Sequence, residues 1–242
     1  MTPAATPPPK VALDAPLRAR FIRRYKRFFA DVETDDGEVI TVHCANPGSM
    51  LGFHRPGAAV RCSTSEDPKR KLRHRLEMMR IGRVWVGLNT GFANALAKRA
   101  LLAGLPRQLA GYAEIASEVA VPEARSRLDF RLRAKRRRDA WVEVKSVTLA
   151  ENGLALFPDS VTERGRKHLS VLRSLREAGD RAALLFLVQR ADCDAVAPAD
   201  AIDPAYGAAL RDAAKAGVEV FALSARVTAR AVTVEGELPV QL

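Results

Sequence analysis

The segment Ser126–Val147, S-R-L-D-F-R-L-R-A-K-R-R-R-D-A-W-V-E-V-K-S-V, decides the fold of this chain. Apolar and polar residues alternate from Leu128 to Leu132, and the same alternation returns from Trp141 to Lys145. Alternation with a period of two indicates strands with one apolar face, and a short polar connection between two such runs indicates a hairpin. The segment therefore predicts two antiparallel strands that are joined by the basic turn Lys135–Arg138.

The position of this turn also fixes which side chains lie opposite each other. A turn centred near Arg136 or Arg137 places Asp129 opposite a residue between Glu143 and Lys145, because facing positions in an antiparallel pair sum to a constant. Direct cross-strand neighbours have Cβ atoms roughly 5 Å apart. We therefore expect two carboxylates and one ammonium group to meet on one face of the hairpin.

Such a group of side chains is suited to metal-dependent chemistry. Two adjacent carboxylates repel each other, and a hard divalent cation with oxygen ligands removes this repulsion. A lysine beside the metal can orient or deprotonate the water that attacks a phosphodiester. The alternative is a solvated cluster of surface charges, which contributes roughly 0–1 kcal/mol per ion pair.

Composition and charge narrow the classes of partner. The 242 residues are 48% apolar and 28% charged, as in ordinary globular proteins, and they carry a net charge of +11. The positive charge is uneven, since residues 1–180 have a net charge of +13 and residues 181–242 a net charge of −2. A polyanion is the predicted partner, with nucleic acid preferred over an anionic membrane.

Cysteine usage and hydropathy predict a cytoplasmic protein that is not in a membrane. The 3 cysteines form no C-x-x-C pair, which argues against a disulfide framework and a cysteine zinc site. No basic segment followed by an apolar segment marks a secretory signal at the N-terminus. The longest strongly apolar run, Ala182–Val188, has the length of a buried strand and not of a membrane span.

The N-terminal third predicts a Pro-rich disordered tail over residues 1–16 and a small β-barrel over residues 17–88. Short strand-like segments recur at regular spacing: Phe28–Glu33, Val39–His43, Ala58–Ser63 and Arg83–Leu88. Asn46-Pro47-Gly48 fits a type II turn. Between Leu17 and Val32, six basic residues alternate with aromatic ones, which are expected either to fill the core or to stack on bases. The basic residues of this part that we expect to contact phosphates are Arg23, Arg24, Lys26, Arg27, Lys69, Arg70 and Lys71.

From residue 89 onwards the pattern changes to alternating helices and strands. The expected elements are a helix at Phe92–Ala103, a strand at Glu114–Val121, the hairpin, a helix from the N-cap Thr162 to Ala178, a strand at Arg181–Gln189, a helix at Pro204–Ala216 and a strand at Val218–Leu223. This order predicts an α/β domain with a mixed central sheet over residues 89–242. The chain has neither a G-x-G-x-x-G nor a G-x-x-x-x-G-K-[ST] motif, which disfavours the nucleotide-binding folds that carry them.

Asp129 followed by Glu143-Val144-Lys145 in such an α/β domain resembles the PD-(D/E)XK nuclease superfamily. More specific motifs occur along nearly all of the chain after residue 16: R-Y-K-R-F (Arg24–Phe28), N-x-G-S-M (Asn46–Met50), P-K-R-K (Pro68–Lys71), S-R-L-D-F (Ser126–Phe130), V-E-V-K-S-V-T-L (Val142–Leu149), F-P-D-S-V-T-E-R-G-x-K-H-L (Phe157–Leu169) and I-D-P-x-Y (Ile202–Tyr206). Together they resemble the bacterial sugar fermentation stimulation protein A family. One departure is Ala45 before Asn46, where the family usually has proline.

The resemblance implies an oligonucleotide-binding (OB) barrel followed by a nuclease-like α/β domain, with DNA as the partner. It implies that Mg²⁺ or Mn²⁺ binds to Asp129 and Glu143, with the carbonyl of Val144 as a third ligand and Glu118 as a further candidate. Lys145 would act on the attacking water. The residues expected to hold phosphates beside the site are Arg164, Lys167 and His168, although His168 could instead be an ordinary histidine on a helix surface.

Three functions remain open at this point. The first is a DNA-binding protein with a Mg²⁺-dependent nuclease site, and the second is a non-catalytic DNA-binding regulator of sugar metabolism genes that keeps the fold as a scaffold. The third is an RNA-binding or RNA-processing protein, since OB barrels accept either polymer. The choice between single- and double-stranded DNA and the existence of a homodimer are not decided by the sequence.

Overall fold

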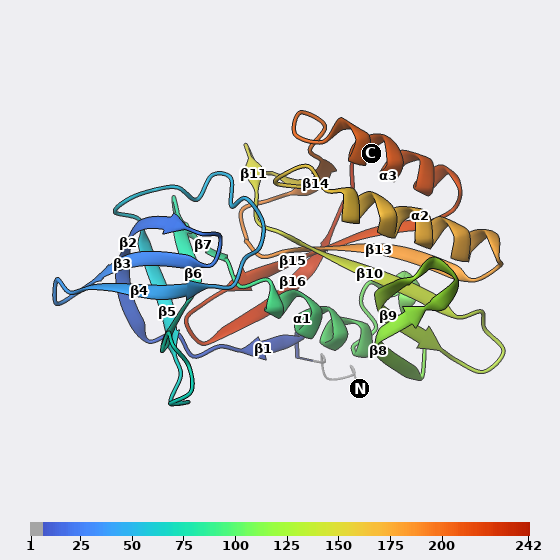
Figure 1. Ribbon diagram of the computed structural model, residues 1–242. Helices are drawn as coiled ribbons and strands as arrows, with labels where there is room; N and C mark the ends of the chain where they lie inside the picture. The colour runs from blue at the N-terminus through green and yellow to red at the C-terminus, as the bar shows by residue number, and fades with distance from the viewer. Residues whose placement is uncertain (1–6) are drawn as a thin grey trace.

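The computed structural model describes residues 7–242 and consists of a barrel beside a larger α/β domain (Figure 1). The barrel strands are β2 (Leu17–Tyr25), β3 (Phe29–Thr34), β4 (Val39–Cys44), β5 (Ala59–Thr64), β6 (His74–Ile81) and β7 (Val84–Gly87). They pair in the order β4-β3-β2-β5-β6-β7, and a parallel pairing of β4 with β6 closes the barrel. This closed barrel confirms the predicted OB-like fold.

The second domain is built on a mixed sheet of seven strands in the order β1-β16-β15-β13-β10-β9-β8. Its strands are β1 (Lys10–Ala12), β8 (Glu114–Val121), β9 (Ser126–Arg133), β10 (Ala140–Val147), β13 (Arg181–Val188), β15 (Glu219–Val227) and β16 (Ala231–Leu238). A small sheet lies beside it, with β11 (Ala150–Glu151), β12 (Leu154–Phe157) and β14 (Ala195–Pro198). Single turns of 3₁₀ helix occur at Arg107–Leu109 and Pro122–Ala124.

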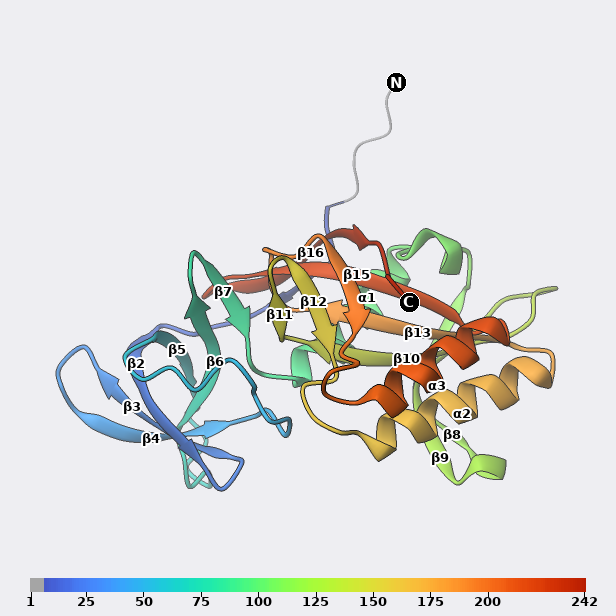
Figure 2. The ribbon, with the colours of Figure 1, turned by 90° about the horizontal axis from the view of Figure 1, so that it is seen from above.

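Three helices cover the two faces of the large sheet. α1 (Gly91–Leu102) packs on one face, where its Leu96 joins a core that includes Val142 and Leu185. α2 (Glu163–Glu177) and α3 (Pro204–Lys215) lie side by side on the other face (Figure 2). No helix in residues 7–242 is long and apolar enough to cross a membrane. The mixed sheet with helices on both faces confirms the predicted α/β fold.

The N-terminal segment differs from the prediction. Residues 1–6 lie outside the described part of the chain, but Lys10–Ala12 forms β1, which pairs antiparallel with β16. Leu13 and Ala15 are buried in the core under α1. The prediction of a disordered tail is thus wrong for this part, because alternate apolar residues at Val11, Leu13 and Ala15 give the segment a face that the sheet buries.

One further prediction in the barrel needs correction. Asn46-Pro47-Gly48 is not a type II turn, since Gly48 does not have the positive φ that this turn requires. Instead the side chain of Asn46 accepts a hydrogen bond of 2.9 Å from the Gly48 N–H. Of the aromatic residues in the basic segment, Phe21 belongs to the core, whereas Phe28 is 43% exposed.

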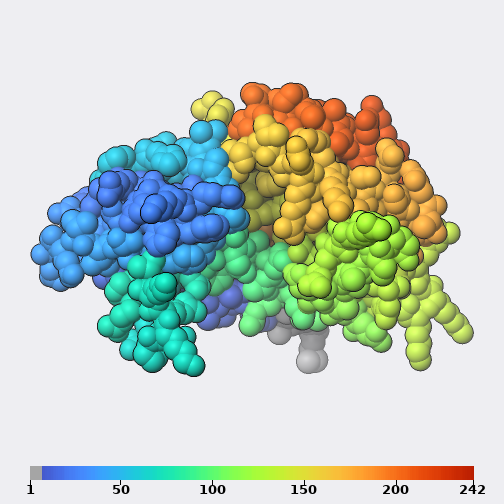
Figure 3. Space-filling view, viewed as in Figure 1, coloured from blue at the N-terminus to red at the C-terminus, as the bar shows by residue number. Residues whose placement is uncertain are grey.

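The barrel and the α/β domain are held together by polar contacts around two glycines. The Gly87 N–H donates to the carbonyl of Gln189 at 2.9 Å. The Met50 N–H donates to Oδ2 of Asp159 at 2.9 Å, and a Cβ on Gly48 would lie only 2.8 Å from the same oxygen. Gly48 is therefore required by the close approach of Asp159. Figure 3 shows a hollow between the barrel and α2, with residues of the large sheet deep inside it.

Candidate functional site

The site forms where the predicted hairpin β9–β10 opens. The backbone pairing of the two strands ends at Phe130 and Val142, and the same register continued would place Asp129 opposite Glu143. Beyond this point the Asp129 carboxylate takes the place of a backbone carbonyl of β9 as hydrogen-bond acceptor, since its Oδ2 accepts the N–H of Val144 at 2.7 Å. Its Oδ1 accepts the side-chain amide of Asn94 on α1, also at 2.7 Å. Helix α1 and strand β10 thus fix the orientation of Asp129.

Glu143 lies at the centre of a buried charged cluster. Its Oε1 accepts a hydrogen bond of 2.7 Å from Nζ of Lys145 and contacts Nδ1 of His168 on α2. Glu143 and His168 are 3% and 5% exposed. A solvated surface cluster is therefore the wrong interpretation of these charges, and His168 is not an ordinary surface histidine.

The second oxygen of the Glu143 carboxylate is the unusual atom of the site. Oε2 is buried and has no hydrogen-bond partner within residues 7–242. Buried polar atoms are nearly always paired, because an unpaired acceptor costs on the order of 1–3 kcal/mol. This oxygen is therefore available to a ligand that brings positive charge.

The two carboxylates differ in their pKa values. Burial and the neighbouring charge of Glu143 raise the pKa of Asp129 from 3.8 to about 6. For Glu143, burial would raise the pKa, but hydrogen bonds and positive charge from His168 and Lys145 outweigh burial and lower it. The repulsion between the two carboxylates therefore contributes to the raised pKa of Asp129, as expected for an acidic pair without a cation.

The residues present fit a hard divalent cation. Asp129 and Glu143 supply carboxylate oxygens, and one of these oxygens is unpaired and buried. The carbonyl of Val144 lies on the same edge of β10 as its N–H, which points to Asp129, because both groups of one strand residue face the same neighbour. Oxygen donors of this kind are the ones that Mg²⁺ and Ca²⁺ prefer.

The other residues predicted around the site are less central. Glu118 lies on β8 between Ser117 and Val119, which keeps it in register with Asp129, but it has a positive φ of 55° and its side chain is exposed. Arg164 donates from Nε to Nε2 of His168 at 3.5 Å. Lys167 is exposed, and its Nζ donates to the carbonyl of Arg125 at 3.3 Å.

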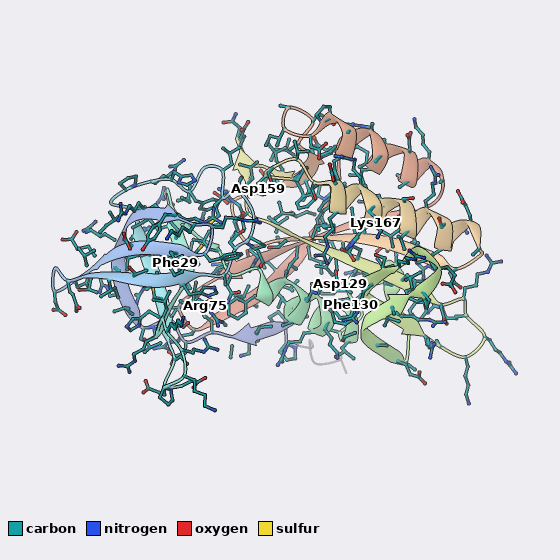
Figure 4. The ribbon with its side chains drawn as sticks, in the orientation of Figure 1. Phe29, Arg75, Asp129, Phe130, Asp159 and Lys167 are labelled. Atoms are coloured by element: carbon teal, nitrogen blue, oxygen red, sulfur yellow. The ribbon has the colours of Figure 1, made fainter. Side chains whose placement is uncertain are left out.

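A cavity of about 380 Å³ lies next to this cluster, between the two domains. Arg27 and Pro47 line it from the barrel, and Ser146, Asp159 and Arg164 line it from the α/β domain. In Figure 4, Asp159 lies between the barrel residues Phe29 and Arg75 and the site residue Asp129. The cavity therefore separates the barrel from Ser146 and Arg164, which are the lining residues next to the charged cluster.

The predicted basic residues of the barrel fall into two groups. Arg23 and Arg24 already have protein partners: Nε of Arg23 donates to Asp31 at 2.8 Å, and Arg24 donates to the carbonyls of Asn46, Gly48 and Ser49. The exposed residues in loops are Lys26 and Arg27 in the β2–β3 turn and Lys69, Arg70 and Lys71 between β5 and β6; of these, Arg27 donates to the carbonyl of Pro47 at 3.0 Å. The second group forms the open basic surface.

Sequence reasoning missed three residues that shape the site. Asn94 was assigned only to a helix, although it is the one polar residue in F-A-N-A-L-A. Gln189 is fully buried and donates to Oγ of Ser146 at 2.8 Å. Tyr206 is also fully buried, and within the described chain its hydroxyl has no partner. Asn94 could have been noticed as a polar interruption, but the other two depend on long-range packing.

Comparison with known proteins agrees with this architecture. A family model described as the SfsA N-terminal OB domain matches residues 22–88, and one described as the sugar fermentation stimulation protein RE domain matches residues 91–231. The sugar fermentation stimulation protein homolog of Geobacter sulfurreducens is 50% identical over 219 residues, which is 90% of this chain and 93% of that protein. The homolog of Maricaulis maris is 46% identical over 227 residues, 93% of this chain and 96% of that protein.

A solved structure is similar over the whole fold. The structure of Pyrococcus furiosus SfsA in complex with Ca²⁺ has a TM-score of 0.85 and 27% sequence identity, and the match covers 96% of this chain and 100% of that one. Both domains, the hairpin and the surrounding helices are thus those of known relatives. The chain belongs to the sugar fermentation stimulation protein family.

Proposed function

We propose that this chain is a DNA-binding protein whose α/β domain hydrolyses phosphodiesters with the help of a divalent cation. The observation that carries the proposal is the buried, unpaired Oε2 of Glu143 beside Asp129, whose pKa is raised to about 6. The relative from Pyrococcus furiosus was solved with Ca²⁺, which supports a divalent cation in this family. Mg²⁺ or Mn²⁺ would be the working ion.

Each residue of the cluster then has a role. Asp129, Glu143 and the Val144 carbonyl hold the cation, and Asn94 keeps Asp129 in place. Nζ of Lys145 lies 2.7 Å from Oε1 of Glu143, where it can orient a water and take or give a proton. A bound divalent cation polarises a phosphoryl oxygen and lowers the pKa of a bound water. Arg164, at the edge of the cavity, is placed to hold a flanking phosphate.

The barrel supplies the binding surface for the polymer. OB barrels bind nucleic acid on the face of their second and third strands, flanked by the loops that follow the first and fourth strands. Here these strands are β3 and β4, and the two loops carry Lys26 and Arg27 on one side and Lys69–Lys71 on the other. The basic loops therefore lie where this fold binds a phosphate backbone.

A non-catalytic DNA-binding regulator is the second candidate function. One observation favours it: three of the four carboxylate oxygens of Asp129 and Glu143 already have partners within the protein. Such a site is largely self-satisfied without a cation. In this case the acidic pair would serve only as scaffold.

A cleavage assay separates the two functions. Labelled single- and double-stranded DNA and RNA are incubated with the protein in Mg²⁺, Mn²⁺ or EDTA. The nuclease proposal expects products with Mg²⁺ or Mn²⁺ and none with EDTA or with the Glu143→Gln variant purified in the same way. Cleavage that the variant retains would come from a contaminant. If the wild type cleaves no substrate with either ion, the regulator is favoured.

A further inference from the structure

The outer face of the barrel carries a second cavity, of about 370 Å³, away from the acidic pair. Phe29 on β3 and His43 on β4 are direct cross-strand neighbours and form part of its wall together with Leu72. Arg70, Lys71 and Arg75 form its rim. Among the described residues that line it, none carries a carboxylate. The cavity therefore combines flat apolar walls with a positively charged rim.

The aromatic surface continues beyond the cavity. The ring of Phe28 is stacked on His43, with centroids 6.5 Å apart and planes inclined by 20°. Tyr25 is stacked on Phe29 at 5.7 Å and 17°. Phe28 is 43% exposed, so its ring adds open apolar surface beside the cavity. Four flat rings thus lie along one side of the barrel.

The electrostatic surroundings of these rings suit an anionic ligand. Burial and the charges of Arg75 and Arg70 lower the pKa of His43. Asp31, on the same outer face, is paired with Arg23 and also accepts hydrogen bonds from Tyr25 and Thr41. Nε of Arg75 is buried and has no partner within residues 7–242. Positive charge therefore dominates where a backbone phosphate would pass.

This combination selects for one form of nucleic acid. In a duplex each base is stacked on both faces and paired, so its rings cannot reach an aromatic side chain on a protein surface. An unpaired base can leave the stack and lie on Phe, Tyr or His, while Arg and Lys hold the adjoining phosphates. A surface that only had to hold duplex backbone would need the basic residues but not the exposed rings.

The position of Arg27 links the cavity to the hydrolytic site. Its guanidinium lies 5.7 Å from the centroid of the Phe28 ring, and the same side chain lines the cavity between the domains. Arg164 lines that cavity on the other side and contacts His168 of the charged cluster. A strand that leaves the barrel rings over Phe28 can therefore follow this cavity to Arg164, next to the charged cluster.

We propose that the barrel cavity between Phe29, His43 and Leu72 is a base-stacking pocket, and that the protein takes single-stranded nucleic acid or a single-stranded tail. The inference rests on the proposed function, because it names the form of polymer that the site receives. The pocket holds an unpaired base by stacking, and the basic rim holds the phosphates next to it. The strand then passes Arg27 to the acidic pair.

The test measures binding in EDTA, so that no cleavage takes place. Fluorescence anisotropy compares a labelled single strand, its duplex, and a strand of the same length and charge that consists of abasic sites, each as DNA and as RNA where the polymer allows it. We expect the normal single strand of at least one polymer to bind about tenfold or more tighter than the abasic strand, since stacking contributes this much per base. The duplex should bind no better than the abasic strand.

Variants of the rings make the test specific. Phe28→Ala, at an exposed position that the fold does not need, should lose about tenfold in affinity for the single strand and keep its affinity for the abasic strand. The control is Leu102→Ala, which removes a large exposed apolar side chain at the end of α1 and should change nothing. Phe29→Ala should repeat the loss, with its fold checked by circular dichroism.

Equal affinity for normal and abasic strands, or for single strand and duplex, would overturn the stacking pocket even if the protein cleaves DNA. Loss of cleavage in the Glu143→Gln variant with unchanged binding in EDTA leaves the pocket supported. The two proposals can therefore fail separately.

Discussion

At the scale of single residues, Asp129 and Glu143 carry like charges and have opposite pKa shifts. The pKa of Asp129 rises to about 6 from 3.8, so between these values the folded protein holds a proton that the unfolded chain has released. Stability that depends on this residue therefore falls as the pH rises through this window. The lowered pKa of Glu143 changes the stability only at pH values below its ordinary pKa of 4.5.

The first prediction follows from the direction in which Asp129 makes the stability depend on pH. In EDTA, the unfolding free energy of the wild type relative to the Asp129→Asn variant should fall by about 2 kcal/mol between pH 4 and pH 7. His43, whose lowered pKa acts in the same range, is present in both proteins and cancels. Urea unfolding at several pH values measures the difference. Parallel curves for the two proteins would mean that Asp129 is not strained by burial and by Glu143.

The second prediction separates the binding of a cation from the cleavage of the phosphodiester. Lys145→Ala removes the ammonium that occupies Oε1 of Glu143, so the rise in melting temperature with Mg²⁺ or Mn²⁺ should persist or increase, while cleavage is lost. Glu143→Gln should lose both. Lys98→Ala, at an exposed position on α1, is the matched control for loss of one positive charge. Full cleavage by Lys145→Ala would remove this lysine from the reaction.

At the scale of elements, Asp203 ties together the starts of two helices. It is 2% exposed, accepts the N–H of Thr162 at 2.8 Å before α2 and the N–H of Tyr206 at 2.9 Å in α3, and pairs with Arg166 at 3.2 Å. Helix α2 carries His168 and Arg164. The I-D-P-x-Y motif therefore orients the helix that packs on Glu143.

The third prediction uses this arrangement. Asp203→Ala leaves the Thr162 N–H and a half-buried guanidinium unpaired and removes the side-chain acceptor of the Tyr206 N–H, and we expect a loss of about 3 kcal/mol in unfolding free energy. The matched control is Asp200→Ala, which breaks an exposed ion pair with Arg211 and should cost less than about 1 kcal/mol. Urea unfolding gives both values. Similar losses in the two variants would show that Asp203 is no more than one surface charge.

Elements with local signals could be predicted from the sequence, and those that depend on distant partners could not. The strand Glu114–Val121, the hairpin and the cap at Thr162 are found as expected, because turn, alternation and capping residues lie within one segment. β6 and β16 were not predicted: β6 mixes charged and apolar residues, and β16 is defined by its pairing with β15. In the site, the acidic pair followed from hairpin register, whereas Asn94 and Gln189 reach it only through tertiary packing.

At the scale of the whole molecule, function depends on how the barrel is joined to the α/β domain. Gly48 of the barrel lies against Asp159, and its backbone does not need a positive φ. Any side chain there would require Asp159 or the Gly48 loop to move, at the edge of the cavity between the domains.

The fourth prediction therefore concerns Gly48→Ala. The added Cβ would lie 2.8 Å from Oδ2 of Asp159, so the contact between the domains should loosen and limited proteolysis should become faster between them. The matched control is Gly236→Ala, where a Cβ meets nothing within 4 Å and the backbone is compatible with alanine. Equal resistance of the two variants to protease would show that the joint tolerates the side chain.

The pairing of β1 with β16 also determines when the protein can finish folding during synthesis. β1 (Lys10–Ala12) leaves the ribosome before the barrel, but its partner β16 (Ala231–Leu238) is made after the barrel and after β15. The barrel is complete at Gly87 and can fold early, whereas the large sheet must wait until β16 has been made. Until then β1 and the edge strand β15 are open to wrong partners, so nascent chains arrested before residue 231 should be protease-sensitive outside the barrel.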